Sequence, residues 1–332
     1  MRKSIAVLLS VVILITIMSG CDAKWCVKYE GQKVEPDVFN YYVCTTYDNL
    51  VKTGKIIQDE PLDAQSIDGI SAQEYISAKA LEQVLYLCEL EKRYEQSNLE
   101  IAEKTISGLT ISTENEYSLN QQLYSKLNVS KETVLRASIS GKMGYMQQTL
   151  FNSIYGEGGT SAISAEELGN FYSDNYICYS YAYQRLSNAD GTAFTDKEIS
   201  AVRKEFDKIE KDVKNGTKKI DDVAIAYAQA YEQDRTCGKN GVTTTTSVIG
   251  TTDIMLAAKE LTIGEVACME LGGYIFVVQR HDLATTSFAT DNSYSILVEM
   301  KFDSFKEEIL QTALAGNYKV NKKYTQSVVS NL

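Results

Sequence analysis

The sequence predicts an α+β protein in which a helical part, built from both ends of the chain, carries a small inserted α+β unit. Helix-start signals and apolar residues at helical spacing dominate residues 36–175. Aromatic and β-branched runs at 176–186 and 274–279 indicate strands. Helical spacing returns after Ser293. The simplest arrangement therefore packs this last helical segment against the first ones.

The first twenty residues predict an export signal. Two basic residues precede an apolar run that ends at Ile17, which is shorter than the roughly 20 residues that a membrane-spanning helix needs. Met18-Ser19-Gly20-Cys21 follows and resembles the lipobox of bacterial lipoproteins. The resemblance implies that residues 1–20 are removed, that Cys21 carries a lipid, and that the rest of the chain is extracytoplasmic and anchored to the cell membrane. An uncleaved anchor helix with a chance cysteine is the alternative.

Composition excludes several classes of function. The net charge is −11, and loss of residues 1–20 removes two cations, which leaves −13. Because the chain has no basic stripe, we expect no nucleic-acid partner, and the lipid rather than charge must hold it to the membrane. One histidine, His281, and no CxxC pair predict no metal site. No phosphate-binding loop is present either, so we expect no cofactor.

Six cysteines follow Cys21 at wide spacing. Disulfides form outside the cell, so bridges are one interpretation. Buried free thiols are the other, and the spacing favours them because Cys44 and Cys88 fall inside helical patterns. The six are Cys26, Cys44, Cys88, Cys178, Cys237 and Cys268.

The first half of the chain contains a series of helix starts. A strand–turn–strand pattern at 27–34 precedes Pro36, which suits the first turn of a helix because its missing N–H costs nothing there. Capping boxes pair a hydroxyl with a carboxylate three residues later. They predict helices that start at Ser71, Thr113, Ser164 and Thr195, and Ser130 is expected to cap a helix that runs to about Ile154.

The second half alternates between strands and helices. We expect strands at 176–186, 265–270 and 274–279, helices at 196–214, 221–230 and 253–260, and a polar loop at 237–252. This order predicts a small α+β domain over residues 176–289. Residues 21–175 and 290–332 would then form one discontinuous helical domain.

Three stretches carry a family resemblance. They are CVKYEGQKVEPDVF at 26–39, ISAEELGNFYSDNY at 163–176 and AAKELTIGEVACMELGGYIFVVQR at 257–280. Their order and spacing resemble the extracytoplasmic foldases of the PrsA and SurA type. The resemblance implies a SurA/trigger-factor-like helical chaperone domain with an inserted parvulin-like domain, the fold of a family of prolyl isomerases.

The chain departs from the parvulin pattern at the expected catalytic positions. Parvulins place two histidines around the substrate proline, and here those positions are Gln184 and Ile275. The only histidine, His281, is expected in a surface turn. We therefore expect no catalytic residue. Because prolyl isomerisation requires only a site that favours the twisted amide, an isomerase with an altered site is the alternative.

The sequence thus predicts a chaperone-like or foldase-like lipoprotein that binds unfolded or secreted polypeptides without strong catalysis. The residues expected to contact the peptide are Tyr183, Met255, Leu256 and Phe276. A solute-binding lipoprotein is a further alternative, but such proteins usually have two α/β lobes. The oligomeric state is not predicted.

Overall fold

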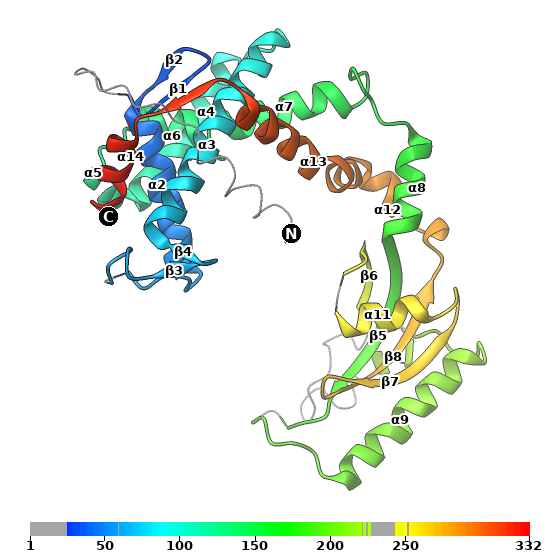
Figure 1. Ribbon diagram of the computed structural model, residues 1–332. Helices are drawn as coiled ribbons and strands as arrows, with labels where there is room; N and C mark the ends of the chain where they lie inside the picture. The colour runs from blue at the N-terminus through cyan, green and yellow to red at the C-terminus, as the bar shows by residue number, and fades with distance from the viewer. Residues whose placement is uncertain are drawn as a thin grey trace. The chain divides into compact units, whose positions relative to one another are not determined.

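The computed structural model describes residues 25–58, 60–188, 190–220, 222–223, 225–226, 243–250 and 252–332. The chain divides into two compact units (Figure 1). Unit 1 contains residues up to 162 together with 301–332, and unit 2 contains residues 163–300. Helices with antiparallel sheets confirm the α+β class. The expectations for residues 1–20, Cys21, Cys237 and most of the helix at 221–230 lie outside the described residues.

In unit 1, a small sheet joins the two ends of the chain. β1 (Val27–Tyr29) pairs with β2 (Gln32–Val34) on one side and with β9 (Tyr318–Val320) on the other. Gly31 has a φ of 86° in the turn between β1 and β2, a conformation that glycine adopts without strain. A second hairpin joins β3 (Ser66–Ile67) to β4 (Ile70–Ser71), and α14 (Lys322–Val329) ends the chain.

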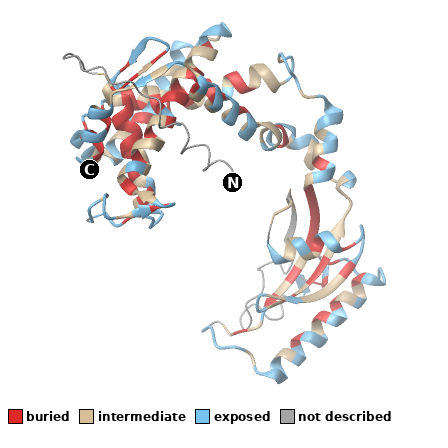
Figure 2. Ribbon diagram, in the orientation of Figure 1, coloured by how far each residue is buried: buried red, intermediate tan, exposed pale blue. Residues whose placement is uncertain are grey.

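The helices of unit 1 pack around large apolar side chains. α2 (Pro36–Lys52) begins at its proline, and α3 (Ala72–Gln96) begins after the capping box of Ser71 and Glu74, both as predicted. α7 (Lys142–Tyr155) meets the second half of α13 (Ser293–Ala315) where the rings of Phe151 and Phe305 pack edge to face at 5.5 Å. Figure 2 shows that the buried positions of this unit are concentrated in α2 and α3.

Two helix predictions in unit 1 are wrong. Thr113 lies inside α4 (Glu103–Leu119), where its hydroxyl donates to the Leu109 carbonyl, a bond that Thr makes within helices. Ser130 does cap a helix, but α6 (Lys131–Ala137) ends at Ala137 and α7 starts only at residue 142. A side chain at Gly141 would collide with the Leu135 carbonyl oxygen, so this tight passage separates the two helices. The short α5 (Gln121–Lys126) follows α4.

Unit 2 is a four-stranded antiparallel sheet with helices on both faces. The strand order is β6 (Thr243–Val248), β5 (Tyr176–Arg185), β8 (Tyr274–His281) and β7 (Val266–Leu271). α8 (Ala165–Asn175) and α9 (Asp196–Lys214) start at the predicted capping boxes of Ser164 and Thr195. α11 (Asp253–Glu260) also lies where it was predicted. A 3-10 turn (Leu283–Thr285) and α12 (Phe288–Asp291) follow β8.

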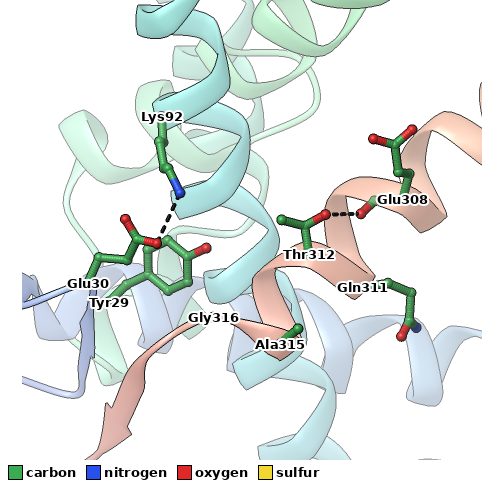
Figure 3. Close-up of a pocket in the computed structure, with 8 residues that line it drawn as sticks. All are labelled: Tyr29, Glu30, Lys92, Glu308, Gln311, Thr312, Ala315 and Gly316. Atoms are coloured by element: carbon green, nitrogen blue, oxygen red, sulfur yellow. Dashed lines mark hydrogen bonds and ion pairs between the residues drawn. The ribbon is translucent and has the colours of Figure 1, made fainter.

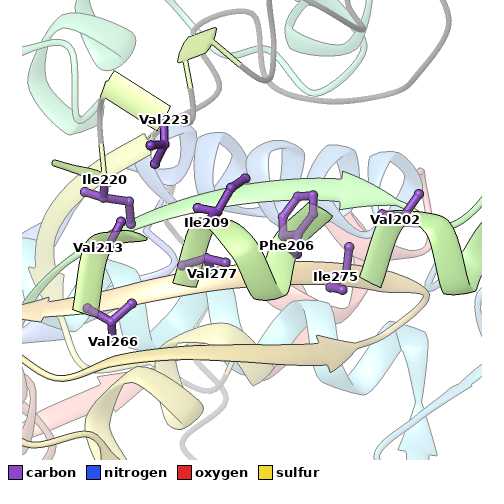
Figure 4. Close-up of a cluster of buried hydrophobic side chains, with 9 residues drawn as sticks. All are labelled: Val202, Phe206, Ile209, Val213, Ile220, Val223, Val266, Ile275 and Val277. Carbon is purple, nitrogen blue, oxygen red and sulfur yellow. The ribbon is translucent and has the colours of Figure 1, made fainter. Parts of the chain in front are cut away.

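Each face of this sheet is covered by a different helix. On one face, Val202, Phe206 and Ile209 of α9 pack against Ile275 and Val277 of β8 (Figure 4). On the other face, Ala258 and Leu261, in and just after α11, pack against Ile177, Tyr179 and Val278. Side chains alternate between the faces along each strand, so neighbouring residues of β5 and β8 have opposite environments.

Two further predictions for unit 2 are corrected. The expected loop at 237–252 contains β6, a run of β-branched residues that pairs with β5 from Tyr176 opposite Val248. His281 is not in a surface turn, because it is the last residue of β8 and lies opposite Cys178. Its Nε2 is 2.7 Å from the Ser180 hydroxyl.

Candidate functional site

An aromatic surface lies on the α11 side of the unit 2 sheet. The register places Tyr183 opposite Phe276, and Tyr181 and Tyr274 lie two residues away on the same strands and the same face. We call these four residues the aromatic face. Ring centroids are 6.0 Å apart for Tyr181 and Phe276, 6.1 Å for Tyr183 and Tyr274, and 5.9 Å for Tyr274 and Phe276. Such spacings are those of mutually stabilising ring pairs.

The aromatic face is less buried than its neighbours. Tyr179 and Val278, farther along the same strands and packed near α11, are 4% and 0% exposed. All four residues of the aromatic face are only half-buried. Met269 lies opposite Phe276 on β7 and is also half-buried. Aromatic rings bordered by a flexible thioether form an adaptable apolar surface, which suits an apolar or aromatic segment of a polypeptide.

The structure brings together three of the four residues expected to contact the peptide. Met255 and Phe276 pack against the same apolar cluster, and the Tyr183 ring lies 6.3 Å from that of Phe276. Leu256 does not join them and is 44% exposed. Because successive helix residues are rotated by about 100°, Met255 faces the sheet while its neighbour Leu256 faces outward.

Sequence reasoning missed Tyr181 and Tyr274. Both belong to strands that were predicted, and the two-residue alternation along a strand was the signal that could have found them. Tyr181 precedes Tyr183 by two positions, and Tyr274 precedes Phe276 by two. Because side chains alternate between the faces of a strand, the residues two positions before Tyr183 and Phe276 lie on the same face as these two.

The positions that correspond to the parvulin histidines lie on the opposite face of the sheet. Gln184 and Ile275 are directly opposite each other in the β5–β8 register, and both are 0% exposed. Ile275 is part of the core beneath α9 (Figure 4). The Gln184 amide donates to the Arg185 carbonyl at 2.7 Å. A peptide on the aromatic face therefore could not reach either side chain.

One serine–histidine pair lies in the described part of the sheet of unit 2. Ser180 and His281 form a close pair, but Ser180 is 2% exposed in the middle of β5 and cannot attack a substrate there. Among the residues that the structure describes, no group of three His, Cys, Asp or Glu side chains is placed to hold a metal ion. In the same residues, no helix is long and apolar enough to cross a membrane.

Comparisons with known proteins gave structural likenesses only. No protein-family model matches the chain, and no curated protein matches it. The foldase protein PrsA from Streptococcus pneumoniae is similar at 16% identity and a TM-score of 0.37, over 78% of this chain and 90% of that one.

Two further PrsA structures are similar. The peptidylprolyl isomerase PrsA from Bacillus anthracis matches at 12% identity and a TM-score of 0.31, over 71% of this chain and 95% of that one. PrsA from Bacillus subtilis matches at 14% and 0.27, over 77% and 93%. The chain is thus similar to PrsA structures, as its motifs predict.

Proposed function

We propose that this chain is a membrane-anchored, extracytoplasmic lipoprotein of the chaperone or foldase kind. It binds unfolded or secreted polypeptides and has no strong catalytic activity. The observation that carries the proposal is the aromatic face, a contiguous set of half-buried rings on one face of the sheet. Contiguous apolar surface of this kind marks interaction sites.

The chemistry of the aromatic face suits transient binding. Each large apolar side chain that a client buries contributes roughly 2 kcal/mol, and ordering the client costs part of that gain. Contacts with a few rings then give weak binding that is not specific for one sequence. Unfolded polypeptides present many such side chains, so a surface of this kind binds them and releases them again.

The first test measures how well the protein prevents aggregation of a reduced, unfolded model client. We expect wild-type protein to suppress light scattering, and Tyr183→Ala and Phe276→Ala to lose most of that effect. Tyr294→Ala is the matched control, because Tyr294 is a 44% exposed tyrosine of the same unit that lies outside the aromatic face. Equal suppression by all four proteins would contradict a role for the aromatic face.

The second test separates binding from catalysis. The alternative function is prolyl isomerisation by an altered site, in which the rings of the aromatic face hold the proline. The buried positions of Gln184 and Ile275 favour binding alone. A coupled assay on a proline-containing tetrapeptide should then give the uncatalysed rate. Acceleration that disappears in Tyr183→Ala would instead establish the isomerase.

The lipid anchor rests on the lipobox that ends at Cys21, outside the described residues. Expression in a bacterium with labelled palmitate should label the wild-type protein and place it in the membrane fraction. Cys21→Ser should carry no label and should not mature at this position. Equal labelling of both proteins would refute the anchor while leaving client binding untouched.

A further inference from the structure

Unit 1 contains a groove that is lined by both apolar and charged side chains. It has a volume of about 560 Å³ and lies between the end of β1, α3 and the last turns of α13 (Figure 3). Tyr29, Ala315 and Gly316 provide its apolar part. Glu30, Lys92 and Glu308 provide its charged part. We call it the α3–α13 groove.

A buried carboxylate fixes the position of the Tyr29 ring. The Tyr29 hydroxyl donates to Glu89 at 2.6 Å, and Glu89 is 2% exposed. Glu89 also accepts from Arg93 at 3.0 Å and from Lys92 at 3.3 Å. The ring is therefore held in one orientation before any ligand arrives, which lowers the entropy cost of binding.

Gly316 packs close against the Tyr29 ring. A Cβ there would lie 3.1 Å from the Tyr29 hydroxyl oxygen and 3.2 Å from a ring carbon, which is tighter than ordinary contact. Ala315 beside it is exposed and has a small side chain. Tyr29 itself is 5% exposed, so the apolar part of the groove is Ala315 together with the small exposed part of the Tyr29 ring. An unbranched aliphatic chain can lie against Ala315 there.

The charges around the groove do not balance. Three carboxylates, Glu30, Glu89 and Glu308, face two cations, Lys92 and Arg93. Glu30 and Glu308 are 45% and 58% exposed in their side chains. Each uses Oε1 for its ion pair, and Oε2 of each accepts no hydrogen bond from the residues that the structure describes. The rim therefore offers two accessible carboxylate oxygens.

We propose that the α3–α13 groove receives a lysine or arginine side chain of a polypeptide. The aliphatic stem lies along Ala315 and the exposed part of Tyr29, and the cationic head reaches Oε2 of Glu30 or Glu308. Long basic side chains bury their stems in this way while the charge stays at the surface. The net charge of −11 on the whole chain also draws basic segments toward it.

The claim that the basic side chain belongs to a polypeptide rests on the proposed function. The charge and shape of the groove do not depend on it. The probe is a fluorescent Gly/Ser peptide with four spaced arginines, and its control has citrulline, an uncharged analogue, at the same positions. Fluorescence anisotropy at low salt should show binding of the arginine peptide and little binding of the citrulline peptide.

Two variants test the place of binding. Glu308→Gln should weaken binding about threefold to fivefold, which is the size of one exposed ion pair. Glu157→Gln changes the net charge equally at an exposed residue outside the groove and should leave binding unchanged. Ala315→Tyr fills the groove without changing any charge and should abolish most of the binding, while circular dichroism and thermal unfolding confirm that each variant folds.

The outcomes are distinct. Equal weakening by Glu308→Gln and Glu157→Gln, or wild-type binding by Ala315→Tyr, would overturn the groove and leave only a general charge effect. Phe276→Ala should not change binding of the arginine peptide. If no variant or wild-type protein suppresses aggregation but the groove variants behave as expected, the proposed function fails and the groove site stands.

Discussion

The carboxylate of Glu89 in α3 joins Tyr29 of β1 to Lys92 and Arg93 of α3. Burial acts to raise its pKa, but hydrogen bonds from Tyr29, Arg93 and Lys92 outweigh burial and hold the pKa below its usual value. A carboxyl whose pKa is lowered on folding stabilises the protein fully above its unfolded-state pKa, which is about 4.3. That stabilisation is lost as the pH falls through the lower, folded-state pKa.

The predicted consequence is an acid-sensitive contribution to the stability of unit 1. Glu89→Gln should lower the free energy of unfolding at pH 7 by about 3 kcal/mol, because it removes the buried negative charge to which Tyr29, Arg93 and Lys92 donate. The difference from wild type should shrink as the pH falls from 7 to below the unfolded-state pKa of about 4.3. Urea unfolding across this range measures it, with the exposed Glu100→Gln as control. A difference that does not change with pH would contradict the assignment.

The burial of four cysteines predicts that their thiols react slowly in the folded protein. Desolvation by burial raises the pKa of the Cys26, Cys44, Cys88 and Cys268 thiols to about 12. All four are free thiols in the structure, as is Cys178. Because the thiolate is the reactive form, iodoacetamide at pH 8 should modify these four slowly in the folded protein and rapidly in urea. Mass spectrometry after timed labelling measures this, and fast native labelling of any of the four would contradict it.

The helix α9 covers the face of the unit 2 sheet that lies opposite the aromatic face. Phe206 is 0% exposed and packs with Val202 and Ile209 against β8 (Figure 4). Phe206→Ala should destabilise unit 2 by about 3–5 kcal/mol, since it leaves a cavity in a packed core. Lys204→Ala lies on the exposed side of the same helix and should change stability by less than about 0.5 kcal/mol. Denaturant unfolding monitored by circular dichroism compares the two.

Some helix starts could be predicted from the sequence, whereas the context of Thr113 and the strand β6 could not. Ser71, Ser164 and Thr195 precede real helix starts, because the chain enters each helix from an extended residue there. Thr113 has the same local pattern, but ten helical residues precede it and the helix continues through it. β6 was missed for another reason: its strand character depends on pairing with β5, more than sixty residues away.

Part of the candidate site could be predicted from the sequence. Tyr183 and Phe276 could be chosen because both strands were recognised, but their neighbours required the register between strands. Leu256 was chosen with Met255 because the sequence does not say which side of α11 faces the sheet. The α3–α13 groove could not be predicted at all, since it joins residue 29 to residue 316 through a sheet formed by both chain ends.

At the scale of the whole molecule, the two binding surfaces should respond differently to salt. Ion pairs between exposed groups are screened within about 8 Å at physiological ionic strength and more strongly at higher salt. Raising NaCl from about 20 mM to about 500 mM shortens the screening length severalfold. Binding of the arginine peptide to the wild-type protein should therefore fall steeply over this range. Suppression of aggregation through the aromatic face should change little, because apolar burial does not depend on charge. Equal salt dependence of both activities would mean that one surface serves both.

The pairing of β1 with β9 has a consequence for biosynthesis. Val27 lies opposite Val320, so the sheet of unit 1 cannot close until synthesis has passed residue 320. Unit 2 contains only residues 163–300 and can complete its contacts earlier, because domains generally fold as units during synthesis. Until its last strand emerges, the first half of this protein is itself an unfinished polypeptide with an unpaired strand edge, exposed to proteases and to aggregation.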